Sequence, residues 1–159
     1  MNQISDTSAA YLAGLIDGEG SIGLFINHCP TRRSTKGAVI ARLKIGMCDE
    51  ALIKWLQSHT ESGTVTSWKH KESPKWKPCW VIAWHGRHAA AVINAVWPYL
   101  RLKRPQAKLL MQWIDIAMEW QAKLGGRART DRRYPDSVWT EVERLALEIK
   151  KLNQKGTSV

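Results

Sequence analysis

Cysteine is scarce in this chain of 159 residues, and long apolar runs are missing. The three cysteines, Cys29, Cys48 and Cys79, are widely spaced and include no C-x-x-C pair. This pattern argues against a disulfide framework and against structural zinc, and it predicts reduced thiols inside a cell. No apolar stretch approaches the roughly 20 residues that a membrane span needs. The first residues also lack the basic and apolar regions of a secretory signal.

These absences predict an intracellular protein that is not secreted and has no membrane partner. We expect it to act in the compartment where it is made, which is an organelle matrix, a stroma or a prokaryotic cytoplasm.

Acidic residues are also few relative to basic ones. The chain has 14 Asp and Glu against 24 Lys and Arg, which gives a formal net charge of +10. Such an excess attracts polyanions, nucleic acid first and anionic membrane second. The charge alone also fits a protein whose surface is simply basic. A hydrophobic content of 44% is typical of a globular fold, and the length predicts one domain over residues 1–159.

Tryptophan, in contrast, is abundant, with nine residues. Tryptophans can form a stacking platform for bases. However, Trp80 and Trp84 share one face of an alternating segment with Ile82, so we expect most tryptophans to lie in the core.

Apolar periodicity predicts an α+β fold. Two strand pairs alternate with single helices, which favours a four-stranded antiparallel sheet with helices on one face and extra C-terminal helices. The core spans about 6–124, a basic loop spans 125–136, and a C-terminal helix spans about 137–154. The predicted elements before that loop are helices over 6–18, 50–59, 87–100 and 103–124 and strands over 21–28, 38–47, 63–70 and 79–86. We expect Asp6 or Thr7 to cap the first helix, Asp49 to cap the second, and Pro98 to end or bend the third.

The segment YLAGLIDGEGSI, residues 11–22, places small residues and two carboxylates at the end of the first helix. Small residues on one stripe let a second helix approach closely. If two copies of this helix cross at a twofold axis, the helix ends meet near that axis. The predicted dimer interface consists of Ala10, Ala13, Gly14, Asp17 and Gly18.

In such a dimer both copies of Glu19 approach the axis, where the last helical carbonyls carry partial negative charge. Carboxylate and carbonyl oxygens suit a hard divalent cation, best Mg²⁺, although Mn²⁺ or Ca²⁺ can occupy such a site. A cation there can support cleavage of a phosphodiester. We expect Gly20 to adopt a left-handed conformation after the helix. The alternative is that Asp17 and Glu19 are ordinary surface residues at a helix end.

The sheet face without helices is predicted to contact double-stranded DNA. A two-stranded ribbon fits the major groove, where Arg and Lys suit guanine, Asn suits adenine, and apolar atoms suit the thymine methyl. The alternative is an ordinary solvated sheet face. Basic loops over 31–36 and 127–133 are expected to contact the DNA backbone. The predicted DNA-binding residues are Gly23, Phe25, Asn27, Arg32, Arg33, Lys36, Ile40, Arg42, Lys44, Thr66, Trp68, His70, Lys77, Cys79 and Val81.

LAGLIDGEG, residues 12–20, resembles the signature of the LAGLIDADG homing endonucleases and matches it at seven of nine positions. A second segment, WPYLRLKRPQAKLL over 97–110, resembles the P-x-L-x-x-K-x-x-Q-A segment of the same family. The resemblance implies a saddle-shaped sheet and an intron-encoded or similarly mobile enzyme that cuts a long, near-palindromic DNA site. A single motif implies a homodimer.

The resemblance also implies roles for individual residues. Glu19 would bind the catalytic metal with help from the Gly18 carbonyl, and Lys103 would lie near the scissile phosphate as a second catalytic residue. Asp17 is interpreted as structural. Relatives carry a polar residue, often Gln, where this chain has Met47.

The Met47 departure leaves alternatives open. Nearby polar residues could compensate, and the candidates are Arg42, Lys44, Asp49 and Lys54. The chain could instead be a catalytically silent DNA-binding protein, or an intron maturase or RNA-splicing factor on the same fold. RNA is an expected partner only in that last case.

Overall fold

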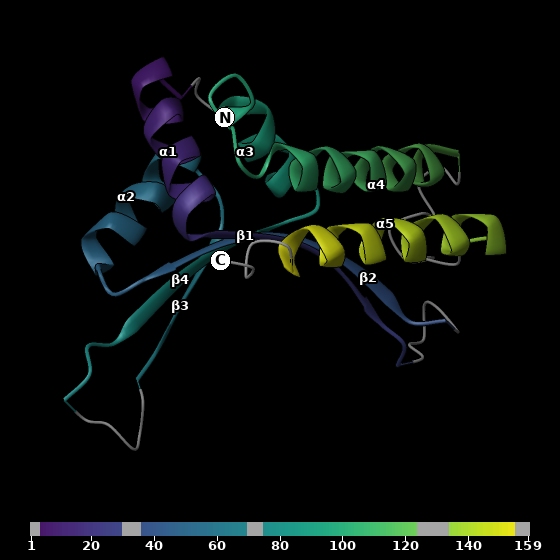
Figure 1. The fold of residues 1–159 in the computed structure, drawn as a ribbon, viewed down its shortest axis with the longest axis horizontal. Coiled ribbons are helices and arrows are strands. Elements are labelled where there is room, and N and C mark those ends of the chain that lie inside the picture. The colour runs from purple at the N-terminus through teal and green to yellow at the C-terminus, as the bar shows by residue number, and fades with distance from the viewer. Residues whose placement is uncertain (1–3, 30–35, 70–74, 124–133, 155–159) are drawn as a thin grey trace. The chain divides into compact units, whose positions relative to one another are not determined.

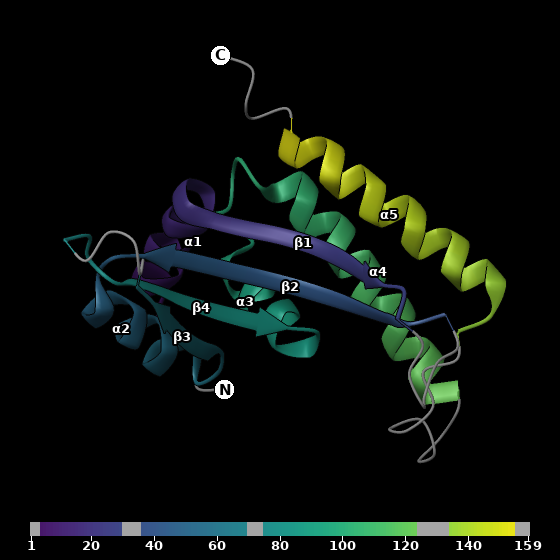
Figure 2. The same ribbon diagram turned by 90° about the horizontal axis from the view of Figure 1, so that it is seen from below.

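The computed structural model describes residues 4–29, 36–69, 75–123 and 134–154 (Figure 1). The four strands form one sheet in the order β1-β2-β4-β3 (Figure 2). In chain order the elements are α1 (Asp6–Glu19), β1 (Gly20–Asn27), β2 (Ala38–Met47), α2 (Glu50–Thr60), β3 (Thr64–Trp68), β4 (Cys79–His85), α3 (Arg87–Val96), α4 (Arg104–Lys123) and α5 (Asp136–Gln154). The predicted α+β class with a four-stranded antiparallel sheet is confirmed.

Element ends follow local chemistry and differ slightly from the prediction. Ser5 is the N-cap of α1, because its hydroxyl accepts a hydrogen bond from the Ser8 backbone N–H at 3.2 Å. The expected caps Asp6 and Thr7 were therefore wrong. Asp49 caps α2 as predicted, with Oδ1 accepting from the Leu52 N–H at 2.8 Å. Helix α3 ends at Val96, earlier than predicted. Trp97 still has helical φ and ψ, but Pro98 has no backbone N–H with which to continue the helix.

Contacts along the chain divide it into two compact units. The first comprises Met1–Ser21 and Arg42–Arg104, and the second comprises Ile22–Ala41 and Pro105–Val159.

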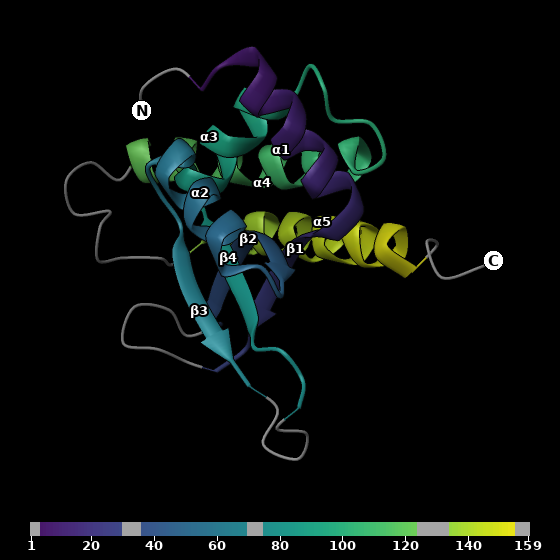
Figure 3. The same cartoon turned by 90° about the vertical axis from the view of Figure 1, so that its left-hand side faces the viewer.

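In the first unit, helices α1, α2 and α3 lie on one side of the strands (Figures 1 and 3). Strands β2 and β4 pair Leu43 with Trp84 and Ile45 with Ile82. All four side chains are fully buried, so this strand face forms the core against the helices. The Trp84 indole donates to Thr60 Oγ1 at 3.1 Å, which satisfies its buried N–H. The expectation that tryptophans serve mainly as core holds for Trp84 but not for the exposed Trp68.

In the second unit, α4 and α5 lie side by side (Figures 1 and 2) and bury Leu110, Trp113 and Trp139. Asn153 of α5 donates to the Ile22 carbonyl of β1 at 3.0 Å, which joins this helix to the strand.

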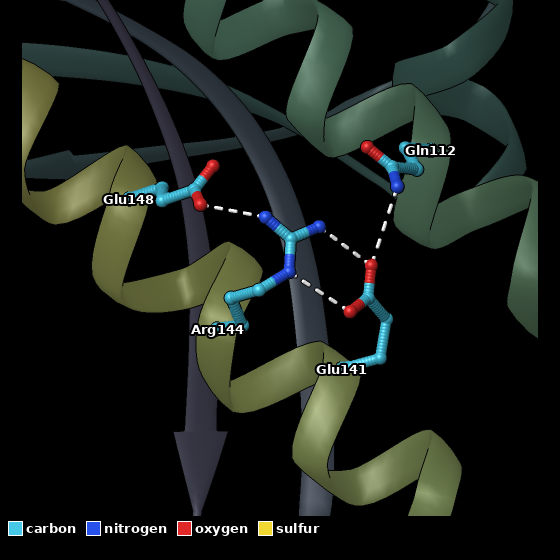
Figure 4. A network of polar contacts seen from close by, with 4 residues as sticks. All are labelled: Gln112, Glu141, Arg144 and Glu148. Carbon is cyan, nitrogen blue, oxygen red and sulfur yellow. Dashed lines mark hydrogen bonds and ion pairs between the residues drawn. The ribbon is translucent and has the colours of Figure 1, made fainter.

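Helices α4 and α5 are also linked by an exposed polar network (Figure 4). Glu141 accepts from Gln112 of α4 at 3.3 Å and from Arg144 of its own helix at 2.6 Å, and Arg144 also pairs with Glu148. Such exposed pairs each contribute little, about 0–1 kcal/mol. The buried apolar residues therefore hold the two helices together.

Within the described residues, no helix is both long enough and apolar enough to cross a lipid bilayer.

Candidate active site and nucleic-acid interface

The last turn of α1 ends in a sharp change of direction at Gly20. Gly20 has φ −74° and ψ 152°, which is extended backbone, and its N–H bonds back to the Ile16 carbonyl. The expected left-handed conformation was wrong. Glycine is needed here for another reason, because an added Cβ would lie 2.8 Å from the Ile16 Cα. The tight exit carries the chain directly from Glu19 into β1.

The side chain of Lys103, a residue just before α4, contacts the C-terminal end of α1. Its Nζ donates to the Ile16 carbonyl at 2.9 Å and to the Asp17 carbonyl at 2.7 Å. These carbonyls belong to the last turn of the helix, where partial negative charge accumulates, and the Ile16 carbonyl accepts from both Gly20 and Lys103. Partial burial lowers the pKa of Lys103, and the negative charges of Asp17 and Glu19 act in the opposite direction. The structure thus brings Lys103 to the helix end that carries the two carboxylates.

The Asp17 carboxylate binds the backbone of residues 101–103, the segment that includes Lys103. Its Oδ2 accepts from the Arg101 backbone N–H and its Oδ1 from the Lys103 backbone N–H, both at 2.9 Å. The Arg104 guanidinium donates to the Trp97 carbonyl at 2.7 Å, which links the two ends of the connection between α3 and α4. These contacts agree with the interpretation of Asp17 as a structural residue.

Glu19 differs from Asp17 because it is exposed at the last position of α1. The carbonyl of the preceding residue, Gly18, also belongs to the last turn, which has no helical partner for it. One carboxylate and one carbonyl are hard oxygen donors of the kind that Mg²⁺ and Ca²⁺ prefer. No group of three or more His, Cys, Asp or Glu suited to a metal occurs within the described parts of the chain.

Met47 is the last residue of β2 and pairs with Trp80 of β4. Strand alternation places it on the same face as Leu43 and Ile45, the face that the helices cover. A thioether offers only a weak acceptor there.

The four polar residues proposed to compensate for Met47 are engaged or lie on the other face. Asp49 caps α2, and Lys54 pairs with Glu50 at 2.7 Å. Arg42 and Lys44 alternate with the buried residues of β2 and so belong to the opposite sheet face.

That opposite face carries the predicted DNA-binding residues of the first unit. Across the strands, Thr66 pairs with Val81 and Trp68 with Cys79. Trp68 is 48% exposed, whereas Arg42 and Lys44 of β2 are half-buried. The result is a mixed surface of cations, a hydroxyl and apolar groups.

Sequence reasoning missed three members of this face. His85 pairs with Arg42, Ala83 pairs with Lys44, and Thr64 pairs with Ala83 from the other side. The same two-residue alternation that selected Cys79 and Val81 could have found them. The predicted residue Lys77 is exposed but precedes β4, and His70 lies outside the described residues.

The predicted DNA-binding residues of the second unit vary in exposure. Phe25 is 43% and Ile40 is 39% exposed, and Asn27 is exposed while its Oδ1 accepts from the Cys29 N–H. Gly23 is buried, because the Phe25 ring folds over it within 2.6 Å of where a Cβ would stand. Gly23 therefore lies on the same strand face as Phe25 but beneath its ring, and its contact with DNA stays a prediction.

Of the predicted DNA-contacting cations after β1, Lys36 is among the described residues. Lys36 forms an ion pair with Asp136 at 2.5 Å. The other two cations, Arg32 and Arg33, and the loop over 127–133 lie outside the described residues.

Helix α1 exposes the small residues Ala10, Gly14 and Gly18. A Cβ added at Gly14 or Gly18 would meet nothing within 4 Å, so space is open on this side of the helix. Ala13, one position before Gly14, lies on the inner side of the helix and is fully buried in the core of the chain. Its assignment to the dimer interface was therefore wrong.

Several solved homing endonucleases have a similar fold. The homing endonuclease I-CvuI, in complex with the I-CreI target in the presence of Mg, matches with a TM-score of 0.70 and 25% identity over 92% of this chain and 82% of that chain. The archaeal intron-encoded homing endonuclease I-Vdi141I, complexed with DNA, matches with a TM-score of 0.69 and 14% identity over 92% and 84%. The homing endonuclease I-TnaI matches with a TM-score of 0.66 and 15% identity over 95% and 99%.

No protein-family model and no curated protein matches the sequence. The solved neighbours also include the LAGLIDADG meganuclease I-CpaMI bound to uncleaved DNA and the LAGLIDADG homing endonuclease I-GzeII in complex with a DNA target. The chain therefore has the fold of the LAGLIDADG homing endonucleases.

Proposed function

We propose that this protein is a site-specific endonuclease that cuts both strands of a long, near-palindromic DNA site as a homodimer. The observation that carries the proposal is the position of the Lys103 ammonium. It donates to the carbonyls of Ile16 and Asp17 in the last turn of α1, the turn that ends at the exposed Glu19. A cation and a free carboxylate at one helix end are the groups that a phosphodiester-cleaving centre needs.

The oxygen donors of this helix end fit a hard divalent cation. Glu19 would supply a carboxylate oxygen, and the neighbouring Gly18 would supply its carbonyl. When bound, Mg²⁺ would help generate a hydroxide nucleophile and neutralise charge on the phosphate. The solved I-CvuI complexes were obtained with Mg or Ca, which supports a divalent cation in this fold.

Lys103 would stabilise the charge that develops on the phosphate in the transition state. Its hydrogen bonds to the Ile16 and Asp17 carbonyls hold the ammonium at the helix end before substrate arrives, so little reorganisation is needed. The open side of α1 at Gly14 would admit the same helix of a second copy, which brings two copies of Glu19 together.

Base recognition would use the strand face that the helices leave free. In the first unit this face carries Arg42, Lys44 and the exposed Trp68. Cationic side chains can bond guanine in the major groove, and apolar atoms can contact the thymine methyl. The formal net charge of +10 would strengthen binding to the phosphate backbone in a salt-dependent way.

The test uses DNA that carries the host locus without its intron, incubated with the purified protein and Mg²⁺. We expect double-strand cleavage by the wild type, and no cleavage but retained binding by Glu19→Gln. The variant keeps the size and exposure of the side chain, so its fold should be unchanged. Cleavage by Glu19→Gln at the wild-type rate would contradict the proposed role of this residue.

Met47 supports a second candidate, a catalytically weak DNA-binding protein on the same fold. Met47 offers no strong hydrogen-bonding group, and Asp49 and Lys54 nearby are already engaged. Specific binding of the same DNA without cleavage would favour this function. Faster splicing of the intron transcript would favour a maturase.

A further inference from the structure

Two of the three cysteines meet across the strands of the first unit. Cys48 follows the last residue of β2, and Cys79 is the first residue of β4. Their sulfur atoms are 3.7 Å apart although they are 31 positions apart in sequence. Cys48 is exposed and Cys79 is half-buried, so the pair is accessible from solvent.

The backbone at this pair already has a geometry that a disulfide accepts. The antiparallel register of β2 and β4 runs up to Met47 opposite Trp80, and one further step in this register would set Cys48 opposite Cys79. Residues directly opposite in an antiparallel pair have Cα atoms about 4.5–5.5 Å apart. Disulfides span Cα separations of about 4.4–6.8 Å. Rotation of the two side chains would therefore be enough to close the bond.

We propose that Cys48 and Cys79 form a redox-sensitive dithiol that closes to an intramolecular disulfide when the protein meets a peroxide or a small-molecule disulfide.

The chemistry with hydrogen peroxide proceeds in two steps. The Cys48 thiolate attacks one peroxide oxygen, the O–O bond breaks, and hydroxide leaves and takes up a proton. The Cys79 sulfur then attacks the resulting sulfenic sulfur, and its proton leaves with the displaced hydroxide as water. In total, two thiols and one peroxide give one disulfide and two water molecules. With a small disulfide, two exchange steps release two small thiols instead.

The surroundings of the pair favour this order of attack. The hydrogen bond with Cys48, the loss of solvent and the negative charge of Cys48 all raise the pKa of Cys79. Cys79 therefore keeps its proton while the exposed Cys48 meets the oxidant. The third cysteine, Cys29, belongs to the second unit and is exposed, which makes it a matched control.

Closure would change a surface that the proposed function uses. Cys79 pairs with Trp68 on the strand face that we propose reads DNA. The bond would also link the start of β4 to Cys48, which directly precedes Asp49, the N-cap of α2. This consequence, unlike closure itself, rests on the proposed function. We expect oxidation to weaken DNA binding by roughly tenfold, as the loss of one good contact would.

The first experiment measures closure without DNA. The full-length protein is treated with hydrogen peroxide or oxidised glutathione, and free thiols are counted by alkylation and mass spectrometry. The wild type should fall from three alkylated thiols to one, and Cys29→Ser should fall from two to none, both reversibly. Cys48→Ser and Cys79→Ser should form no intramolecular bond.

Thermal unfolding provides an independent readout of closure. A disulfide constrains the unfolded chain, so oxidised Cys29→Ser should melt roughly 5–10 °C above the reduced form. The proposal is overturned if folded Cys29→Ser keeps both thiols under conditions that oxidise the unfolded chain, or if oxidation only joins separate molecules.

The second experiment compares DNA binding before and after oxidation. Wild type and Cys29→Ser should lose affinity, and Cys48→Ser should be insensitive to oxidant. Unchanged affinity of a chain shown to be closed would contradict the effect on DNA. Reduced protein that binds no DNA would instead count against the proposed function, and the thiol counts would still decide closure.

Discussion

Two carboxylates that stand two positions apart have different surroundings. Asp17 accepts two backbone hydrogen bonds from residues 101–103, whereas Glu19 is exposed at the end of α1. Side chains two positions apart on a helix do not face each other, because each residue turns the helix by about 100°. Asp17 therefore makes contacts within the chain, while Glu19 is presented to solvent.

Replacing Lys103 with Met should reduce cleavage by about 10²–10³-fold, as expected when a donor to transition-state charge is removed. Because the Lys103 ammonium already bonds two carbonyls of α1, losing its charge should reduce DNA affinity much less than the cleavage rate. Single-turnover cleavage and binding isotherms would measure the two effects. Lys108→Met, an exposed lysine of α4, is the control and should cleave normally. Equal rates for both variants would remove Lys103 from the proposed mechanism.

Met47→Gln should increase the cleavage rate, by about tenfold if it gains one useful hydrogen bond. The position is half-buried at the end of β2, so a side chain of similar size can be accommodated. Met47→Leu is the matched control, because it conserves volume and adds no hydrogen-bonding group. A rise in both variants, or in neither, would show that the polarity of this position does not limit catalysis.

At the scale of elements, α1 is joined to the segment before α4 through side-chain contacts to backbone groups. Asp17 accepts from the backbone of this segment, and Lys103 returns two hydrogen bonds to α1. This reciprocal arrangement places a cation on carbonyls at the end of the helix, where partial negative charge accumulates. It links the two sequence segments that resemble the family motifs.

Asp17→Ala should lower the free energy of unfolding by about 2 kcal/mol, because two backbone N–H groups lose a charged acceptor. Thermal unfolding should show a fall in Tm of roughly 4–8 °C. Asp115→Ala removes an exposed carboxylate of α4 and should leave Tm nearly unchanged. If Tm changes little in both variants, the contacts of Asp17 with residues 101–103 do not stabilise the fold.

At the scale of the whole molecule, the open side of α1 bears on the proposed homodimer. Ala10, Gly14 and Gly18 are exposed there, and added atoms at the two glycines would meet nothing within their own protomer. A side chain at Gly14 would thus obstruct a second helix without disturbing the fold of one chain.

Gly14→Leu should abolish the dimer while keeping or slightly raising the stability of each protomer, because leucine favours a helix over glycine by up to about 1 kcal/mol. Sedimentation would give the oligomeric state, and thermal unfolding would report the fold. Ala51→Leu places the same side chain on the exposed side of α2 and should leave the oligomeric state unchanged. If Gly14→Leu sediments as the wild type does, this side of α1 is not the interface.

The sequence predicted the elements well because their signals are local. Alternation over 21–28 and 38–47 and the cap at Asp49 each depend on neighbouring residues. Less could be predicted where several residues compete for one local role. Ser5, rather than Asp6 or Thr7, became the cap of α1 because the backbone enters the helix one residue earlier.

By itself the sequence determined the α+β order, the excess of positive charge and the two motif segments with Glu19 and Lys103. Only the tertiary structure decided the contacts between distant residues. It brought Lys103 to the end of α1, placed Phe25 over Gly23, and left Met47 on the covered face of β2. It also brought the sulfur atoms of Cys48 and Cys79 within 3.7 Å of each other. The physical reason is that strand register and packing set which side chains meet, and no local periodicity records the partner across a sheet.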